Sequence, residues 1–113
     1  ELSIFEFEDV KEKFQTHTVK QLESYDVKLV GVRPESWIHT EIGTGMITGE
    51  VQRLEIVGKE RTVRLELENG QIVDITDVDI KFSEGDKVSF TAEAGDMHFF
   101  DGDGNRVVIE DAK

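Results

Sequence analysis

Apolar and polar residues alternate along several short stretches of this 113-residue chain, and such alternation is typical of half-buried β-strands. The clearest stretch is 61–68, where Val63, Leu65 and Leu67 occupy one face and charged residues occupy the other. The pattern therefore predicts a mainly β fold. Further strands are predicted at 2–7, 27–32, 46–57, 73–75, 88–94, 97–100 and 106–109.

The long predicted strand 46–57 changes phase part-way along. Val51 keeps the parity of the apolar residues before it, whereas Leu54 and Ile56 take the other parity. One extra residue in a strand produces such a change. We therefore predict a β-bulge near Gln52-Arg53.

Turn signals separate the predicted strands. Asn69-Gly70 is the strongest, because both residues tolerate the positive φ of a two-residue hairpin turn. Further turns are predicted at 58–60, 83–86 and 101–105. Many short strands with turns at this spacing predict a small OB-like antiparallel β-barrel.

A helical pattern follows the first strand. Asp9 is predicted as its N-cap, and Glu12 stands where a capping box places an acidic residue. We expect one N-terminal helix from there to about Tyr25, with a thin apolar stripe. Residues 16–19 are poor helix formers, so a break is most expected there. Structurally, the simplest role of this helix is to cover one end of the barrel.

The only proline and the only tryptophan of the chain lie close together, directly after the predicted strand 27–32. Pro34 has no N–H to donate and therefore ends the strand. It also restricts Arg33 to an extended conformation. We expect the side chain of Arg33 to be held in one direction at the strand end, and the residues from Trp37 to Gly45 to form a loop.

Length and composition predict one domain, residues 1–113, with a strand-helix lead-in at 1–26 and a barrel at 27–109. A chain of this length buries a core without crosslinks. It contains no cysteine, which excludes disulfides and thiolate chemistry. It begins with Glu1 instead of a methionine, and from this we expect a piece of a longer protein.

The charge balance disfavours two classes of partner. The chain has 25 acidic and 13 basic residues, for a net charge of −12. Nucleic-acid affinity depends largely on Lys and Arg contacts with phosphates, and anionic membrane surfaces attract basic segments. We therefore expect neither nucleic acid nor a membrane surface as a direct partner.

Two glycine-containing stretches fall short of known ligand loops. After 43–45, Thr48 stands where the third glycine of a dinucleotide loop is needed. The stretch 101–105 matches the first half of a calcium loop, but Arg106 and Ala112 replace the glycine and the bidentate glutamate. We interpret the second stretch as a hairpin turn.

The remaining acidic and imidazole groups show no ligand spacing either. One acidic cluster has no histidine or cysteine near it in the sequence and is interpreted as a solvated face: Asp74, Asp77 and Asp79. The histidines are far apart, unlike the ligands of a zinc site: His17, His39 and His98. The residues therefore predict no catalytic, cofactor or metal site.

The stretch Gly31-Val32-Arg33-Pro34-Glu35 resembles the G-[IV]-R-P-E signature of the TOBE domain, a C-terminal regulatory domain in ATPase subunits of ABC importers. The closest resemblance is to the maltose and glycerol-phosphate type. Four further motifs follow in the family's order, so that the resemblance covers residues 27–108: 49–58, 67–71, 84–88 and 98–104. Residues 92–96 depart from the family, which often has a proline there, before the histidine of the last motif.

The resemblance implies a non-catalytic regulatory and dimerisation domain of an ABC-importer ATPase subunit, for sugars or sugar-like solutes. ATP and Mg²⁺ would bind in a nucleotide-binding domain outside this sequence, which has no Walker A motif. The implied partners are a second copy of the ATPase subunit, the membrane permease through the ATPase half, and a regulatory protein or metabolite. The implied location is the cytoplasmic side of the membrane, peripheral to it through the transporter complex.

The candidate interface residues of the motif are Arg33, Pro34 and Glu35. We expect Arg33 and Glu35 to form a salt bridge that fastens the lead-in to the barrel. Contact across a dimer, or with the ATPase half, is the alternative. Two other functions stay open: a free-standing TOBE module that binds a small oxyanion, and an OB-type binder of single-stranded nucleic acid, which the acidic charge disfavours.

Overall fold

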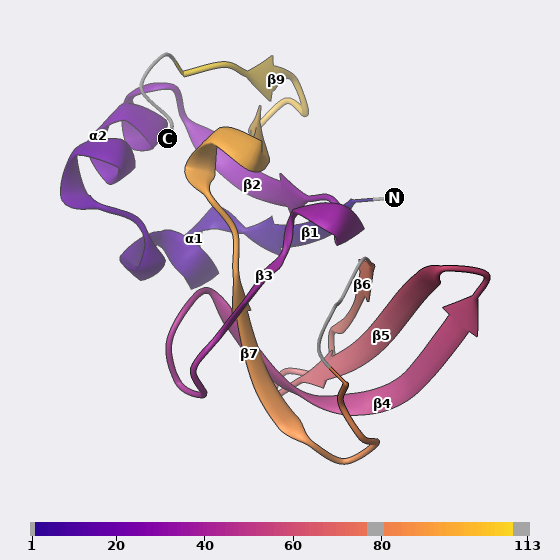
Figure 1. Ribbon diagram of the computed structural model, residues 1–113. Coiled ribbons are helices and arrows are strands. Elements are labelled where there is room, and N and C mark those ends of the chain that lie inside the picture. Colours follow the sequence, from indigo (N-terminus) through magenta and orange to yellow (C-terminus); the bar gives the residue numbers. More distant parts are fainter. Residues whose placement is uncertain (1, 77–80, 110–113) are drawn as a thin grey trace.

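Two antiparallel sheets form a curled half-barrel, and two short helices lie beside the first sheet (Figure 1). This computed structural model describes residues 2–76 and 81–109. The mainly β, OB-like prediction is confirmed. The first sheet has the order β1-β2-β8-β9, with β1 (Ser3–Glu6), β2 (Val27–Val32), β8 (Met97–Asp101) and β9 (Arg106–Val107). The second has the order β3-β7-β4-β5-β6, with β3 (Ile38–Thr40), β7 (Lys87–Thr91), β4 (Ile47–Val57), β5 (Glu60–Leu67) and β6 (Ile72–Thr76).

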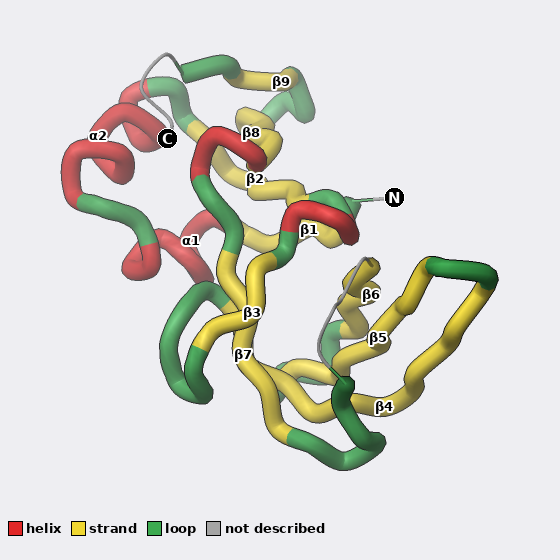
Figure 2. The backbone as a smooth tube through the Cα atoms, viewed as in Figure 1, coloured by secondary structure: helices red, strands yellow, loops and turns green. Residues whose placement is uncertain are grey.

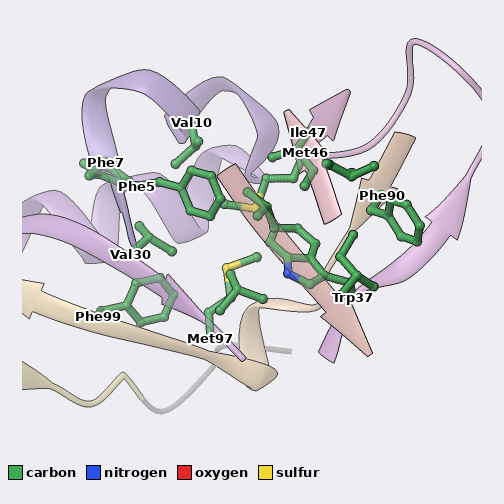
Figure 3. Close-up of a cluster of buried hydrophobic side chains, with 14 of the residues drawn as sticks. Phe5, Phe7, Val10, Val30, Trp37, Met46, Ile47, Phe90, Met97 and Phe99 are labelled. Carbon is green, nitrogen blue, oxygen red and sulfur yellow. The ribbon is translucent and has the colours of Figure 1, made fainter. Parts of the chain in front are cut away.

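The core lies between the inner faces of the two sheets, under the lead-in. Figure 3 shows side chains from β1, β2 and β8 meeting side chains from β4 and β7. Phe5 and Trp37 pack edge to face, with ring centroids 5.9 Å apart, an arrangement that aromatic pairs prefer. The alternation predicted for β5 is confirmed, since Val63 and Leu65 are fully buried.

The helical lead-in is broken, as expected, but at residues 14–15 and not at 16–19, and its first part is not the helix predicted from Asp9. The lead-in forms α1 (Phe7–Val10), a 3₁₀ turn η1 (Lys11–Lys13) and α2 (Thr16–Ser24), and the break is plain in Figure 2. Asp9 lies inside α1 and caps no helix, and Tyr25 is 54% exposed. Neither helix, within the residues that the structure describes, has the length and apolar content to cross a membrane.

Core packing explains the break in the lead-in. Phe14 is extended, with φ −96° and ψ 156°, and its ring centroid lies 6.2 Å from those of Phe7 and Phe99. A continuous helix would carry this ring away from at least one of these partners. Tertiary packing therefore overrides the local helical pattern here.

The predicted bulge in β4 is confirmed. The pairing between β4 and β5 changes register between Val51 and Arg53. The turn that follows β4 has Gly58 at φ +60°, which is the first position of a type II′ turn. The bulge lets the inner face of β4 pass from one parity to the other.

The turn at Asn69-Gly70 occurs where it was predicted, but with a different geometry. Only Gly70 has positive φ, at +87°. Its N–H donates to the carbonyl of Leu67 at 2.9 Å, and the Gln71 N–H donates to Asn69 Oδ1 at 3.0 Å. The loop therefore has three residues and ends in a left-handed glycine.

The chain passes from one sheet to the other at two places, after β2 and after β7. The residues after Trp37 are not all loop, because β3 pairs with β7. The predicted strands 88–94 and 97–100 belong to different sheets, as β7 and β8, and the predicted interruption between them is the 3₁₀ turn η3 (Ala94–Asp96). Residues 77–80, between β6 and β7, lie outside the described residues.

Gly49 is expected to tolerate no side chain. A Cβ there would lie 2.8 Å from the carbonyl oxygen of Glu66 on the neighbouring strand, and a backbone atom cannot move aside alone. We predict that Gly49→Ala lowers the free energy of unfolding by about 1–3 kcal/mol, measured by urea denaturation. Gly102→Ala is the control, because its nearest neighbour would be 3.5 Å away. Equal losses in both variants would contradict the prediction.

Candidate interaction site at the Arg33–Glu35 turn

The strand β2 stops where the proline was predicted to stop it. Arg33 has φ −75° and ψ 150°, and Pro34 begins a single 3₁₀ turn, η2 (Pro34–Ser36). Proline suits the first position of a helical turn, where its missing N–H has no partner to lose. Both local predictions, the strand stop and the extended Arg33, are confirmed.

Arg33 contacts a histidine rather than the lead-in. Its Nε donates a hydrogen bond to Nε2 of His98 at 3.2 Å. His98 lies on β8, directly opposite Gly31 of β2, and Arg33 follows Gly31 by two residues, so both side chains are on the same face of the sheet. The strand register therefore decides this contact.

The predicted Arg33–Glu35 salt bridge is wrong for the part of the chain that the structure describes. Both side chains are exposed, and neither forms an ion pair with a described residue. Glu35 lies on the 3₁₀ turn, while Arg33 still follows the direction of β2. The two side chains are thus available to a partner, and this leaves the interface alternative as a prediction.

The electrostatics at His98 favour the neutral imidazole. Burial lowers the pKa of His98 below its ordinary value of 6.5, and the positive charges of Arg106 and Arg33 lower this pKa further. Because Nε2 accepts the hydrogen bond from Arg33, the ring proton belongs on Nδ1. Protonation of Nε2 would replace this hydrogen bond with repulsion between two cations.

Gly31 makes room beside this contact. A Cβ at Gly31 would lie 3.0 Å from Leu2 Cδ1 and 3.2 Å from Ile4 Cδ1. Its backbone is not in the left-handed region, so the requirement is for space. The glycine of the motif lets Leu2, just before β1, and Ile4 of β1 pack over the end of β2, next to Arg33.

The turn is anchored to both sheets. Trp37, directly after η2, is only 7% exposed and packs on Phe5 of the first sheet, while η2 lies against β6 of the second. The Trp37 Nε1–H has no hydrogen-bond partner among the described residues. Shape rather than hydrogen bonding therefore fixes this side chain, and the turn has little freedom to move.

A groove of about 510 Å³ follows the seam between the sheets. Its polar lining includes the carboxylates of Glu6, Asp9 and Glu68, and no lysine or arginine. Gln71 Nε2 bridges the seam by donating to the carbonyl of Ile4 at 2.7 Å. The concentration of carboxylates makes this groove unfavourable for an anion.

The acidic turn and the acidic strand residue have structural partners. Asp101 Oδ1 accepts hydrogen bonds from the N–H groups of Asp103 and Asn105, both at 2.9 Å. Asp74 forms a two-point ion pair with Arg64, and its carboxylate raises the pKa of Arg64; Asp77 and Asp79 lie outside the described residues. Within the described ranges, no cluster of three or more His, Cys, Asp or Glu side chains is placed to hold a metal ion.

The sequence model of the TOBE domain matches residues 30–100, from β2 to β8, and this span includes Arg33, Pro34 and Glu35. The chain belongs to the TOBE domain family. A TOBE domain is a non-catalytic module, typically regulatory or ligand-binding, of ABC-transporter ATPases or molybdate-binding proteins. No curated protein sequence matches the chain significantly.

His98 is the residue that the sequence alone did not place at this site of the TOBE domain. It lies 65 residues after Arg33, and only the pairing of β2 with β8 brings the two together. The nearest sequence signal was the recurrence of a family motif at 98–104. That motif predicted the strand that contains His98, but it did not predict that this strand pairs with β2.

The stability of this TOBE domain is expected to depend on pH through His98. The folded-state pKa is lowered, so the unfolded chain binds the proton more readily. The contribution is present above pH about 6.5 and is lost as the pH falls from there through the folded-state pKa. His98→Gln, which keeps an acceptor but does not titrate, should reduce this dependence in urea denaturation between pH 7.5 and 5.5. Parallel pH profiles for the two proteins would disprove the assignment.

Proposed function

We propose that this TOBE domain is the regulatory and dimerisation domain of the ATPase subunit of an ABC importer for sugars or sugar-like solutes. The family match over residues 30–100 is the observation that carries the proposal. The resemblance of five motifs, in the order found in the maltose and glycerol-phosphate type, supports the finer assignment. ATP and Mg²⁺ would then bind to a nucleotide-binding domain of the parent chain.

The architecture suits a rigid, non-catalytic domain of a transporter whose catalytic halves move. The core joins both sheets, and the Arg33–Glu35 turn is anchored to both by Trp37 and η2. Such a body can keep two ATPase subunits together while their catalytic halves open and close. The partners proposed are a second ATPase subunit, the permease through the ATPase half, and a regulatory protein or metabolite, at the cytoplasmic face of the membrane.

Regulation through this domain requires unequal affinity. A ligand shifts an equilibrium between open and closed transporters only if it binds one state more tightly than the other. The exposed Arg33 and Glu35, held on a fixed turn, are the proposed contact points for such a ligand or for the second subunit. The alternative, a free-standing oxyanion-binding module, is disfavoured by the net charge of −12 and the acidic groove.

A binding experiment separates these functions. We predict no saturable binding of ATP to the chain by isothermal titration calorimetry, and no rise in melting temperature with molybdate or sulfate. Micromolar affinity for ATP would contradict the regulatory-domain proposal. A saturable stabilisation by molybdate that sulfate does not reproduce would establish the alternative. The upstream coding sequence is an independent check, because it should encode G-x-x-x-x-G-K-[ST] after a strand.

The role of Arg33 is tested in the importer that contains this domain. Arg33→Ala is expected to weaken the coupling between the regulatory signal and transport, because it removes an exposed charge at the proposed contact. The change in the free energy of unfolding should be small, about 1 kcal/mol or less, as for other exposed polar contacts. Lys20→Ala, which removes a charge from the exposed face of α2, is the control. An unchanged regulatory response in Arg33→Ala would remove Arg33 from the interface.

A further inference from the structure

The strand β4 has a free edge along its second half. It pairs with β7 only from Ile47 to Glu50, and the last contacts on that side join Val51 with Gly85 and Asp86 at 2.8 and 2.9 Å. Beyond the bulge β4 pairs with β5 as far as the turn, but with no described strand on its other side. Figure 1 shows the end of this β4–β5 hairpin extending away from the rest of the molecule.

The free edge presents backbone groups in a regular order. Val51 turns its N–H and C=O toward β7, and the bulge then adds one residue. Alternate residues of an antiparallel strand face opposite sides, so Leu54 and Ile56 direct their backbone groups to the open edge. Such an edge is a template for another strand.

Apolar side chains accompany this edge. Leu54 is 38% exposed and Ile56 is 72% exposed. With Val63 and Phe82 they line a groove of about 300 Å³ on the concave side of the hairpin. Scattered exposed apolar residues need no explanation, but a group of them along an unpaired strand indicates an interaction surface.

We propose that a second copy of this chain pairs with the free edge of β4, antiparallel and about a two-fold axis at Leu54. The argument is the order of charges on the opposite face of the strand. Arg53 and Glu55 flank Leu54 and pair with each other within the chain, Nε to Oε1 at 3.0 Å. About the axis, Arg53 of each copy would lie opposite Glu55 of the other, so that the two ion pairs join into one alternating cluster of four charges. In a two-fold contact both copies use the same surface, which must therefore be complementary to itself. The order Arg53, Leu54, Glu55 meets this condition in its charges.

Other registers of the same pairing place like charges together. Because side chains alternate between faces, the register can shift only in steps that keep each face intact. A register centred on Arg53 would place Arg53 opposite Arg53 of the second copy. A register centred on Glu55 would place Glu55 opposite Glu55. A further step places Arg53 opposite Lys59. The charges therefore select the register centred on Leu54.

The paired edge would extend one sheet through both copies and bring Leu54 against Leu54 of the second copy on the concave side. A contact along five residues is smaller than the roughly 1,200 Å² that stable interfaces bury, so it reinforces contacts made elsewhere in the assembly. The inference deepens the proposed dimerisation role and rests on it for the presence of a second copy.

Charge reversal provides the first test. Arg53→Glu and Glu55→Arg each place two like-charge pairs in the contact, and each should weaken self-association about tenfold or more, measured by sedimentation velocity over a concentration series. An equimolar mixture of the two variants should associate again, because it restores both opposite-charge pairs. Lys20→Glu and Glu23→Arg, the same charge changes on exposed positions of α2, are the controls. If the single variants associate as the wild type does, or if their mixture does not recover, the proposal is overturned.

A crosslink provides the second test. The chain has no cysteine, so Leu54→Cys introduces a single thiol. In the proposed register the two Cα atoms form a hydrogen-bonded pair about 5.5 Å apart, a distance that a disulfide bridges. Oxidation should therefore give a disulfide dimer faster than in Ile72→Cys, where the residue lies on the β6 edge and is 47% exposed.

The outcomes separate this inference from the proposed function. Equal crosslinking of the two variants, or none in Leu54→Cys, overturns the β4 contact and leaves that edge for a strand of another protein. The nucleotide, oxyanion and Arg33 experiments do not involve β4 and would keep their results. Conversely, ATP binding would overturn the regulatory role without affecting a Leu54 crosslink.

Discussion

The packing of Trp37 against Phe5 is the contact on which the joint between the two sheets depends. No strand of the described residues belongs to both sheets, so side chains rather than a continuous hydrogen-bond ladder hold them together. Pro34 ends β2 and turns the chain so that Trp37 enters the core. Phe5 packs against it from β1, the edge strand that pairs with β2 in the first sheet. The family motif is therefore first a structural junction, and its exposed side chains lie on a rigid base.

Charge limits what this junction and its surroundings can bind. The net charge of −12 and the carboxylates along the seam are unfavourable for anions, whereas Arg33 offers a cation at a fixed position. A protein surface with complementary charge fits these features better than a small oxyanion does. The same argument gives the β4 edge its register, since Arg53 and Glu55 stand in the order that lets the strand pair with itself.

Local patterns predicted the elements whose structure depends on near neighbours. The alternation in β5, the bulge after Val51 and the stop at Pro34 each follow from a few adjacent residues. The helical lead-in breaks before the predicted place because Phe14 is held by Phe7 and Phe99, and no local signal carries the second of these contacts. The contact of Arg33 with His98 could not be predicted either, because it depends on which strands are neighbours. The sequence therefore predicted the position of the motif, whereas the contact of Arg33 with His98 follows from the pairing of β2 with β8.

The hydrogen bond from Gln71 to the carbonyl of Ile4 has a dynamic consequence. It joins the loop after β5 to the edge strand of the other sheet. Separation of the two sheets at this point would break the bond, so the bond opposes movement of β1 away from the β5–β6 loop. This hydrogen bond is therefore a polar link between the sheets, beside the packing of Trp37 on Phe5 and of η2 on β6.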